Sequence, residues 1–130
     1  MACTVWAIVS HQADGSDALS SLREELRRFA SERDWDQYHS PKNLAAALCV
    51  EAAELLEHFQ WCTDDESKAL PAGQLAEVQE EMADVLLYLV RLADKLDVDL
   101  FEAANNKIVS NAQKYPVDKA RGNNRKYTDL

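Results

Sequence analysis

Two helix-forming segments of this chain each carry a pair of carboxylates three residues apart. The pairs are Glu51 with Glu54 and Glu81 with Asp84. On a helix with about 3.6 residues per turn, side chains at positions i and i+3 project from nearly the same face. If the two helices pack antiparallel, as the short connection between them favours, four carboxylates converge and repel one another unless a cation lies between them.

Carboxylate oxygens are hard ligands that suit Mg²⁺, with Mn²⁺ as the alternative. For a single acid pair on a helix, a solvated polar face is the better interpretation. Here Glu51 lies at the edge of an apolar face that includes Leu44 and Leu55, where an unpaired acid is costly. Two such pairs on neighbouring apolar helices therefore predict a divalent metal site. The predicted ligands are Glu51, Glu54, Glu81 and Asp84.

The hydrophobic pattern predicts helices and no strand, so the expected fold class is all-α. The expected helices cover about 16–34, 41–61, 74–96 and 99–114. Ser40 followed by Pro41 is a clear helix start, and Asp99 with Glu102 matches a capping box for the last helix. The polar connection 62–73 is expected to be a loop that can move over a site.

The third expected helix is apolar around most of its circumference, which leaves only a narrow polar stripe. The stripe consists of Glu77, Glu81, Asp84, Tyr88, Arg91 and Lys95. A helix of this kind is expected to be mostly buried. Because one small subunit cannot cover so much apolar surface, the pattern predicts a homo-oligomer.

A chain of 130 residues is expected to form one domain over 16–130, preceded by a flexible arm over 1–15. The net charge of −9 argues against polymeric nucleic acid as the main partner. The apolar run 5–9 is too short to cross a bilayer and follows no basic segment, so neither a membrane nor a signal is expected. Three cysteines without metal-ligand spacing favour a reducing cytoplasm.

Beyond the acid pairs, an ordered set of motifs resembles the all-α nucleoside triphosphate pyrophosphohydrolases of the MazG-like superfamily, and within it the dCTP pyrophosphatase group. The resemblance covers about residues 20–128. The motifs are Arg33-Asp34-Trp35, His39, Pro41-Lys42-Asn43-Leu44-Ala45, Phe59-Gln60-Trp61, Tyr88, Asn111-Ala112-Gln113-Lys114-Tyr115-Pro116 and Lys119-Ala120-Arg121-Gly122. The implied architecture is a four-helix bundle-like MazG-type fold completed by oligomerisation. A tetramer of two dimers is favoured over a lone dimer.

The resemblance also implies an activity, namely Mg²⁺-dependent hydrolysis of a nucleoside triphosphate to the monophosphate and pyrophosphate. The leading substrate is dCTP or a modified dCTP, in house-cleaning of the nucleotide pool. The paired acids would hold Mg²⁺, and Glu51 or Glu54 would act as general base. The implied substrate-binding residues are Trp35, His39, Trp61 and Tyr88 around the base and sugar, Lys107, Asn111, Lys114, Tyr115 and Arg121 near the phosphates, and Lys42.

Other interpretations stay open on the sequence alone. The enzyme could act on another non-standard nucleotide, or the chain could be a non-catalytic oligomeric adaptor whose acids are merely solvated. A di-iron carboxylate bundle ranks last, because no histidine follows either acid pair at ligand spacing. Trp35 and His39 could equally form a hydrophobic plug at the bundle end, and the basic residues of the last helix could be a solvated face.

Overall fold

The computed structural model describes residues 15–130, and all regular secondary structure in this part of the chain is helical. The all-α prediction is confirmed. The long helices are α1 (Gly15–Glu32), α2 (Pro41–Glu57), α4 (Ala72–Lys95) and α5 (Leu100–Lys114). The short ones are η1 (Asp36–Tyr38), α3 (Asp64–Ser67), α6 (Val117–Ala120) and η2 (Tyr127–Asp129). The expected arm over 1–15 lies outside the described residues, except that Gly15 begins α1.

Side-chain caps fix where the long helices begin. The Ser40 hydroxyl accepts a hydrogen bond from the backbone N–H of Asn43 at 3.2 Å, with Pro41 in the first helical position. Asp99 accepts from the backbone N–H of Glu102 at 2.9 Å, which is the first of the two bonds of the predicted capping box. Both predicted helix starts are confirmed, whereas α2 ends at Glu57, earlier than expected.

The connection between α2 and α4 is more ordered than the sequence indicated. It contains the short helix α3, which begins with a complete capping box. Thr63 accepts from the Glu66 backbone N–H at 3.2 Å, and the Glu66 carboxylate accepts from the Thr63 backbone N–H at 2.8 Å. The prediction of a loop over the whole of 62–73 was therefore wrong, and the Thr-x-x-Glu pattern was the signal that it missed.

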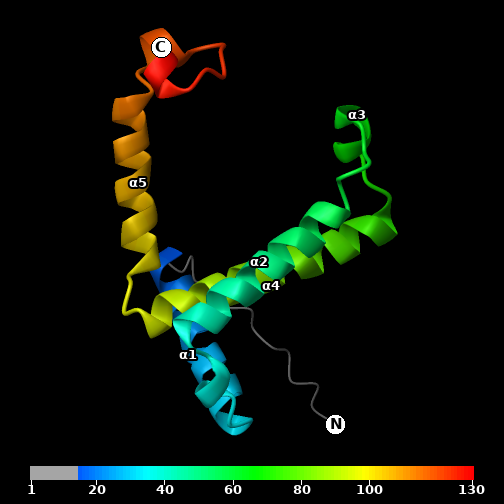
Figure 1. Cartoon of the computed structure of the whole chain (residues 1–130), viewed down its shortest axis with the longest axis vertical. Helices are drawn as coiled ribbons and strands as arrows, with labels where there is room; N and C mark the ends of the chain where they lie inside the picture. The colour runs from blue at the N-terminus through cyan, green and yellow to red at the C-terminus, as the bar shows by residue number, and fades with distance from the viewer. Residues whose placement is uncertain (1–14) are drawn as a thin grey trace, which may run out of the picture.

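Helices α2 and α4 form an antiparallel pair, and α1 crosses α4 (Figure 1). The helices pack through a small set of buried apolar residues, namely Ala30, Leu44, Val78, Val90 and Ala93. Leu44 of α2 is only 1% exposed and is the largest fully buried side chain. This packing holds the two acid-bearing helices side by side, as the short connection predicted.

Helix α5 extends away from the α2–α4 pair, and none of its residues is buried (Figure 1). One described chain therefore does not close a four-helix bundle. Helix α4 was expected to be mostly buried, yet Met82 and Leu86 on it are 57% and 40% exposed. That expectation is wrong for a single chain, in which α5 extends away from α4 and leaves this surface exposed.

Within residues 15–130, no helix combines the length and the apolar character that crossing a membrane requires. Cys49 and Cys62 both carry free thiols, and the Cys62 thiol lies 3.5 Å from the His58 carbonyl oxygen. Cys3 lies outside the described residues.

Candidate active site

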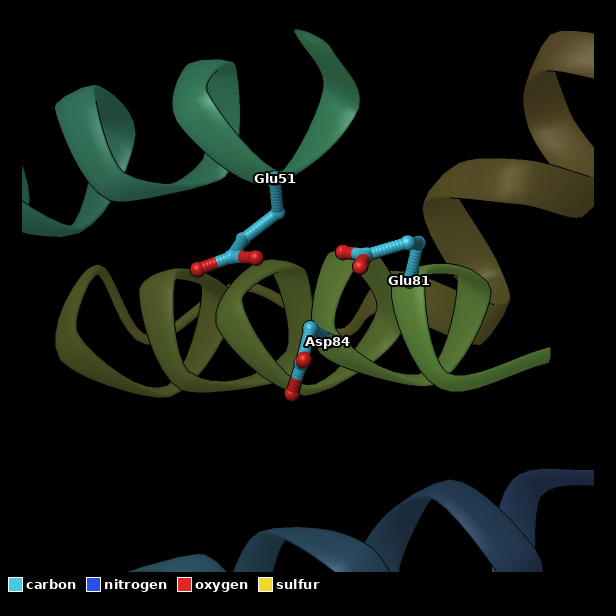
Figure 2. A group of neighbouring side chains, drawn as sticks. All are labelled: Glu51, Glu81 and Asp84. Atoms are coloured by element: carbon cyan, nitrogen blue, oxygen red, sulfur yellow. The ribbon is translucent and has the colours of Figure 1, made fainter. Parts of the chain in front are cut away.

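Three carboxylates from α2 and α4 lie close to one another. One oxygen from each of Glu51, Glu81 and Asp84 lies within 4.8 Å of the other two. Figure 2 shows Glu51 reaching from α2 toward α4, while Glu81 reaches from α4 into the same space. The antiparallel packing of the two acid pairs thus brings together three of the four predicted ligands. We call Glu51, Glu81 and Asp84 the acid triad.

Burial and mutual repulsion oppose the negative charge of this triad. Burial raises the pKa of Glu51 and of Glu81 above their ordinary values, and repulsion from Glu54 and Asp84 raises both further. Glu54 therefore lies near enough to act on the triad electrostatically, although it is not one of the three converging side chains.

The triad fits a hard divalent cation. Within the described residues, Oε2 of Glu81 is buried and has no hydrogen-bond partner. A buried polar atom in this state costs free energy unless a partner is supplied. All the atoms that converge are carboxylate oxygens, which are the ligands that hard divalent cations prefer. A cation between the three side chains would supply the missing partner and relieve the repulsion.

A cavity of about 440 Å³ opens beside the triad, and Asp84 belongs to both. Its volume falls in the range of about 300–1,000 Å³ that is usual for small-molecule sites. Helix α1 provides an apolar wall that includes Leu22 and Phe29. Three of the predicted substrate-binding residues also line this cavity, namely Trp35, His39 and Tyr88.

The sequence left open whether Trp35 is a hydrophobic plug or a ligand contact, and its position in the cavity is compatible with both roles. The Trp35 ring packs edge to face against Phe29, with ring centroids 5.7 Å apart and an interplanar angle of 71°. Trp35 nevertheless remains 45% exposed. The residue therefore packs against the end of α1 and also lines the cavity with a ring that is only half buried.

The remaining predicted substrate contacts lie elsewhere in the single chain. Trp61 is 88% exposed and lines a different depression together with His58 and Glu77. Lys42 is exposed on the first turn of α2. The predicted phosphate contacts do not line the cavity, because α5 and the segment after it extend away from the α2–α4 pair (Figure 1). These contacts are Lys107, Asn111, Lys114, Tyr115 and Arg121, and they stay predictions.

Three arginines that were not among the predicted site residues also line the cavity. Arg28 and Arg33 are exposed on its α1 side, and the Arg33 guanidinium lies 3.7 Å from the centroid of the Phe29 ring. Arg91 of α4 is only 5% exposed. Arg91 could have been found from the sequence, because it follows Tyr88 by three residues on the same polar stripe.

In the metal-free protein, we expect Glu51→Gln to raise the free energy of unfolding at neutral to alkaline pH. The raised pKa of Glu51 means that its contribution to stability is full below the ordinary value of 4.5 and is lost as the pH rises through the folded-state pKa. The uncharged amide removes that loss. Urea unfolding in the presence of a chelator should show a gain over the wild type at pH 8 that disappears at pH 4.

Glu57→Gln is the matched control, because Glu57 is an exposed acid on the same helix outside the triad. It should change the free energy of unfolding little at either pH. A destabilised Glu51→Gln protein at pH 8 would contradict the account of charge repulsion in the triad.

The sequence of this chain is similar to a known protein family and to characterised proteins. A family model described as MazG-like matches residues 46–130. The chain is 50% identical over 114 residues to dCTP pyrophosphatase 1 of Mus musculus, covering 86% of this chain and 67% of that protein. It is 48% identical over 116 residues to dCTP pyrophosphatase 1 of Homo sapiens, again covering 86% and 67%.

A solved structure is also similar to this chain over most of its length. The structure of a pyrophosphatase from Archaeoglobus fulgidus matches with a TM-score of 0.72 at 43% sequence identity. The match covers 76% of this chain and 93% of that one. Together with the convergent carboxylates and the neighbouring cavity, these similarities lead to one conclusion: the chain belongs to the MazG-like family.

Proposed function

We propose that this protein is a nucleoside triphosphate pyrophosphohydrolase that converts dCTP, or a modified dCTP, to the monophosphate and pyrophosphate. The observation that carries the proposal is that Asp84 belongs both to the acid triad and to the aromatic cavity. A group bound in the cavity is therefore adjacent to the carboxylates. The similarity to dCTP pyrophosphatases over most of the chain supports the choice of reaction.

The reaction needs water to attack the α-phosphorus, so that the bond to the bridging oxygen breaks and pyrophosphate leaves. Mg²⁺, with Mn²⁺ as a substitute, would supply neutralisation of the phosphate charge at the acid triad. Glu54 lies near the triad without belonging to it, so we assign to its carboxylate the role of accepting the proton of the attacking water. Glu51 is the alternative proton acceptor.

The cavity suits a nucleoside because it combines ring surfaces with a few polar atoms. Trp35 and Tyr88 offer faces and edges on which a base or sugar can pack, and His39 offers a hydrogen-bonding group. The same cavity has an apolar wall from α1, which leaves room for a substituent on a pyrimidine ring. These features favour a small pyrimidine as the bound base.

We further propose that a second copy of the chain completes the site, in a tetramer built from two dimers. Large apolar side chains are exposed on α4 and α5. Met82 on α4 is 57% exposed, and Ile108 and Val109 on α5 are 66% and 60% exposed. Trp61 is 88% exposed on the same molecule. Burial of these side chains against a second copy would stabilise the assembly and could bring Trp61 and the α5 residues to a neighbouring cavity.

The first prediction of this proposal concerns the acids. Glu81→Gln and Asp84→Asn should each lower kcat/KM for pyrophosphate release from dCTP by at least about 100-fold, because both remove negative charge from the proposed cation site. Glu80→Gln is the matched control on the same helix, since Glu80 is exposed and outside the triad. Full activity in a double Glu81→Gln, Asp84→Asn variant that remains folded would rule out the assignment.

The second prediction concerns the base. Comparing kcat/KM for dCTP, dTTP, dUTP, dATP and dGTP should rank dCTP first. Trp35→Ala should raise KM for dCTP by about five- to 150-fold, since stacking on an aromatic ring contributes about 1–3 kcal/mol per base. Equal values for all five nucleotides, unchanged by this substitution, would refute base recognition by the cavity. A different nucleotide at the head of the ranking would instead identify a pyrophosphohydrolase with another substrate.

The third prediction concerns assembly. Light scattering at assay concentration should give about four times the chain mass, and a monomeric mass would contradict the proposed tetramer.

If Trp61 acts in a neighbour's site, two inactive variants should complement each other. Co-refolding Trp61→Ala with Asp84→Asn should then restore activity above that of either alone. Absence of recovery in verified mixed oligomers would contradict a site in which Trp61 and Asp84 come from different subunits.

A further inference from the structure

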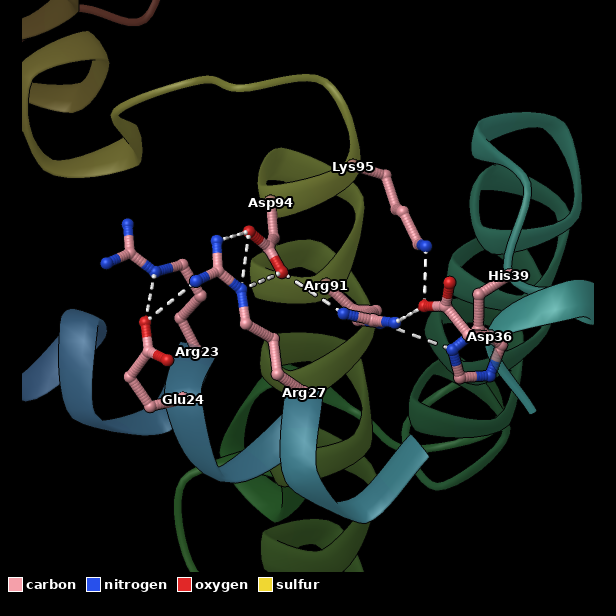
Figure 3. Close-up of polar contacts among 8 residues, drawn as sticks. All are labelled: Arg23, Glu24, Arg27, Asp36, His39, Arg91, Asp94 and Lys95. Atoms are coloured by element: carbon pink, nitrogen blue, oxygen red, sulfur yellow. Dashed lines mark hydrogen bonds and ion pairs between the residues drawn. The ribbon is translucent and has the colours of Figure 1, made fainter. Parts of the chain in front are cut away.

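Arg91 makes polar contacts with three side chains beside the cavity (Figure 3). Its Nη1 donates to Asp94 at 3.1 Å, its Nη2 pairs with Asp36, and its Nε donates to Nδ1 of His39 at 3.2 Å. Asp94 lies on α4, whereas Asp36 and His39 belong to the connection between α1 and α2. One guanidinium therefore ties the connection that carries His39 to α4.

The surroundings hold this guanidinium in place. The Arg91 side chain is only 6% exposed and that of Asp94 only 7%. Asp94 is held from the other side by Arg27 of α1, whose Nε donates to it at 2.9 Å, and Lys95 donates to Asp36 at 2.6 Å. A buried, planar group with several fixed partners has little freedom to rotate.

This contact decides which nitrogen of His39 carries a hydrogen. Arginine has only donors, so a ring nitrogen that receives its N–H must be unprotonated. In a neutral imidazole the hydrogen then resides on the other nitrogen, Nε2. Burial lowers the pKa of His39, and the positive charges of Arg91 and Lys95 lower it further while Asp36 opposes them, which favours the neutral ring.

We propose that Arg91 is a positioning residue that holds His39 as its Nε2–H tautomer, so that the ring presents a hydrogen-bond donor to the ligand in the cavity. Figure 3 shows the second ring nitrogen on the side away from Arg91, and His39 lines the cavity with Trp35 and Tyr88. The group recognised is therefore an acceptor, such as a carbonyl oxygen of a base or a sugar oxygen. This role deepens the proposed function and rests on it for the identity of the ligand.

The tautomer can be measured without any nucleotide. Long-range ¹H–¹⁵N spectra of the free wild-type protein at pH 7.5 should show His39 with a protonated Nε2 and an unprotonated Nδ1. A spectrum of His39→Phe assigns the signals among the three histidines of the chain. A His39 ring with a protonated Nδ1, or an even mixture of both tautomers, would overturn the proposal whether or not any variant of Arg91 folds.

Arg91→Met keeps much of the length of the side chain and removes all its donors, while Arg91→Lys keeps the charge without the planar fork. In Arg91→Met we expect a mixture of His39 tautomers and a rise of about tenfold in KM for dCTP, with kcat changed less than about threefold. Arg91→Lys should give a smaller rise. An unchanged tautomer and KM in Arg91→Met would contradict the positioning role.

Arg27→Met is the matched control, because Arg27 bonds to the same Asp94 but does not contact His39. Its His39 spectrum and KM should match the wild type. If Arg27→Met reproduced both changes seen in Arg91→Met, the effect would be a general loosening of the ionic contacts, and the specific role of Arg91 would be refuted. Failure of dCTP turnover with the expected tautomer would count against the proposed function only.

Discussion

The repulsion among carboxylates between α2 and α4 is the constraint on which the candidate site depends. Packing of Leu44 and the other buried apolar side chains brings the two helices together. The same packing places Glu51, Glu81 and Asp84 so close that their negative charges repel one another. Such a cluster lowers the stability of the folded chain unless a cation is bound. The packing free energy of the helices thus offsets the cost of placing these carboxylates together, and the resulting site attracts a positive charge.

The local features that sequence reasoning captured depend on neighbours along the chain. The caps at Ser40 and Asp99 require residues within one helical turn, and the i, i+3 spacing of each acid pair fixes its face of the helix. The antiparallel pairing of α2 and α4 followed from the short connection. These features therefore needed no knowledge of the distant packing that determines the rest of the structure.

Features set by long-range contacts were harder to predict. The direction in which α5 leaves α4 depends on the turn at 97–99, where Asp97 has a positive φ of 54°. In the single chain that direction keeps the basic residues of α5 away from the cavity. The helical periodicity of α5 does not predict the direction, so this outcome could not be read from the sequence. Arg91 was assigned to a polar stripe, yet it is buried because Asp36 and Asp94 supply it with partners. Asp94 is only three residues away, but Asp36 is distant in the sequence, so its contact with Arg91 could not be read from the helical pattern.

The binding of a divalent cation to the acid triad is the central claim, and calorimetric titration of the metal-free protein tests it most directly. Mg²⁺ or Mn²⁺ should bind to the wild type, because a cation between the three carboxylates offsets the burial and the mutual repulsion that raise the pKa values of Glu51 and Glu81. Folded Glu51→Gln should bind the same ion much more weakly. Equal binding by the variant and the wild type, or no binding by the wild type, would contradict the account.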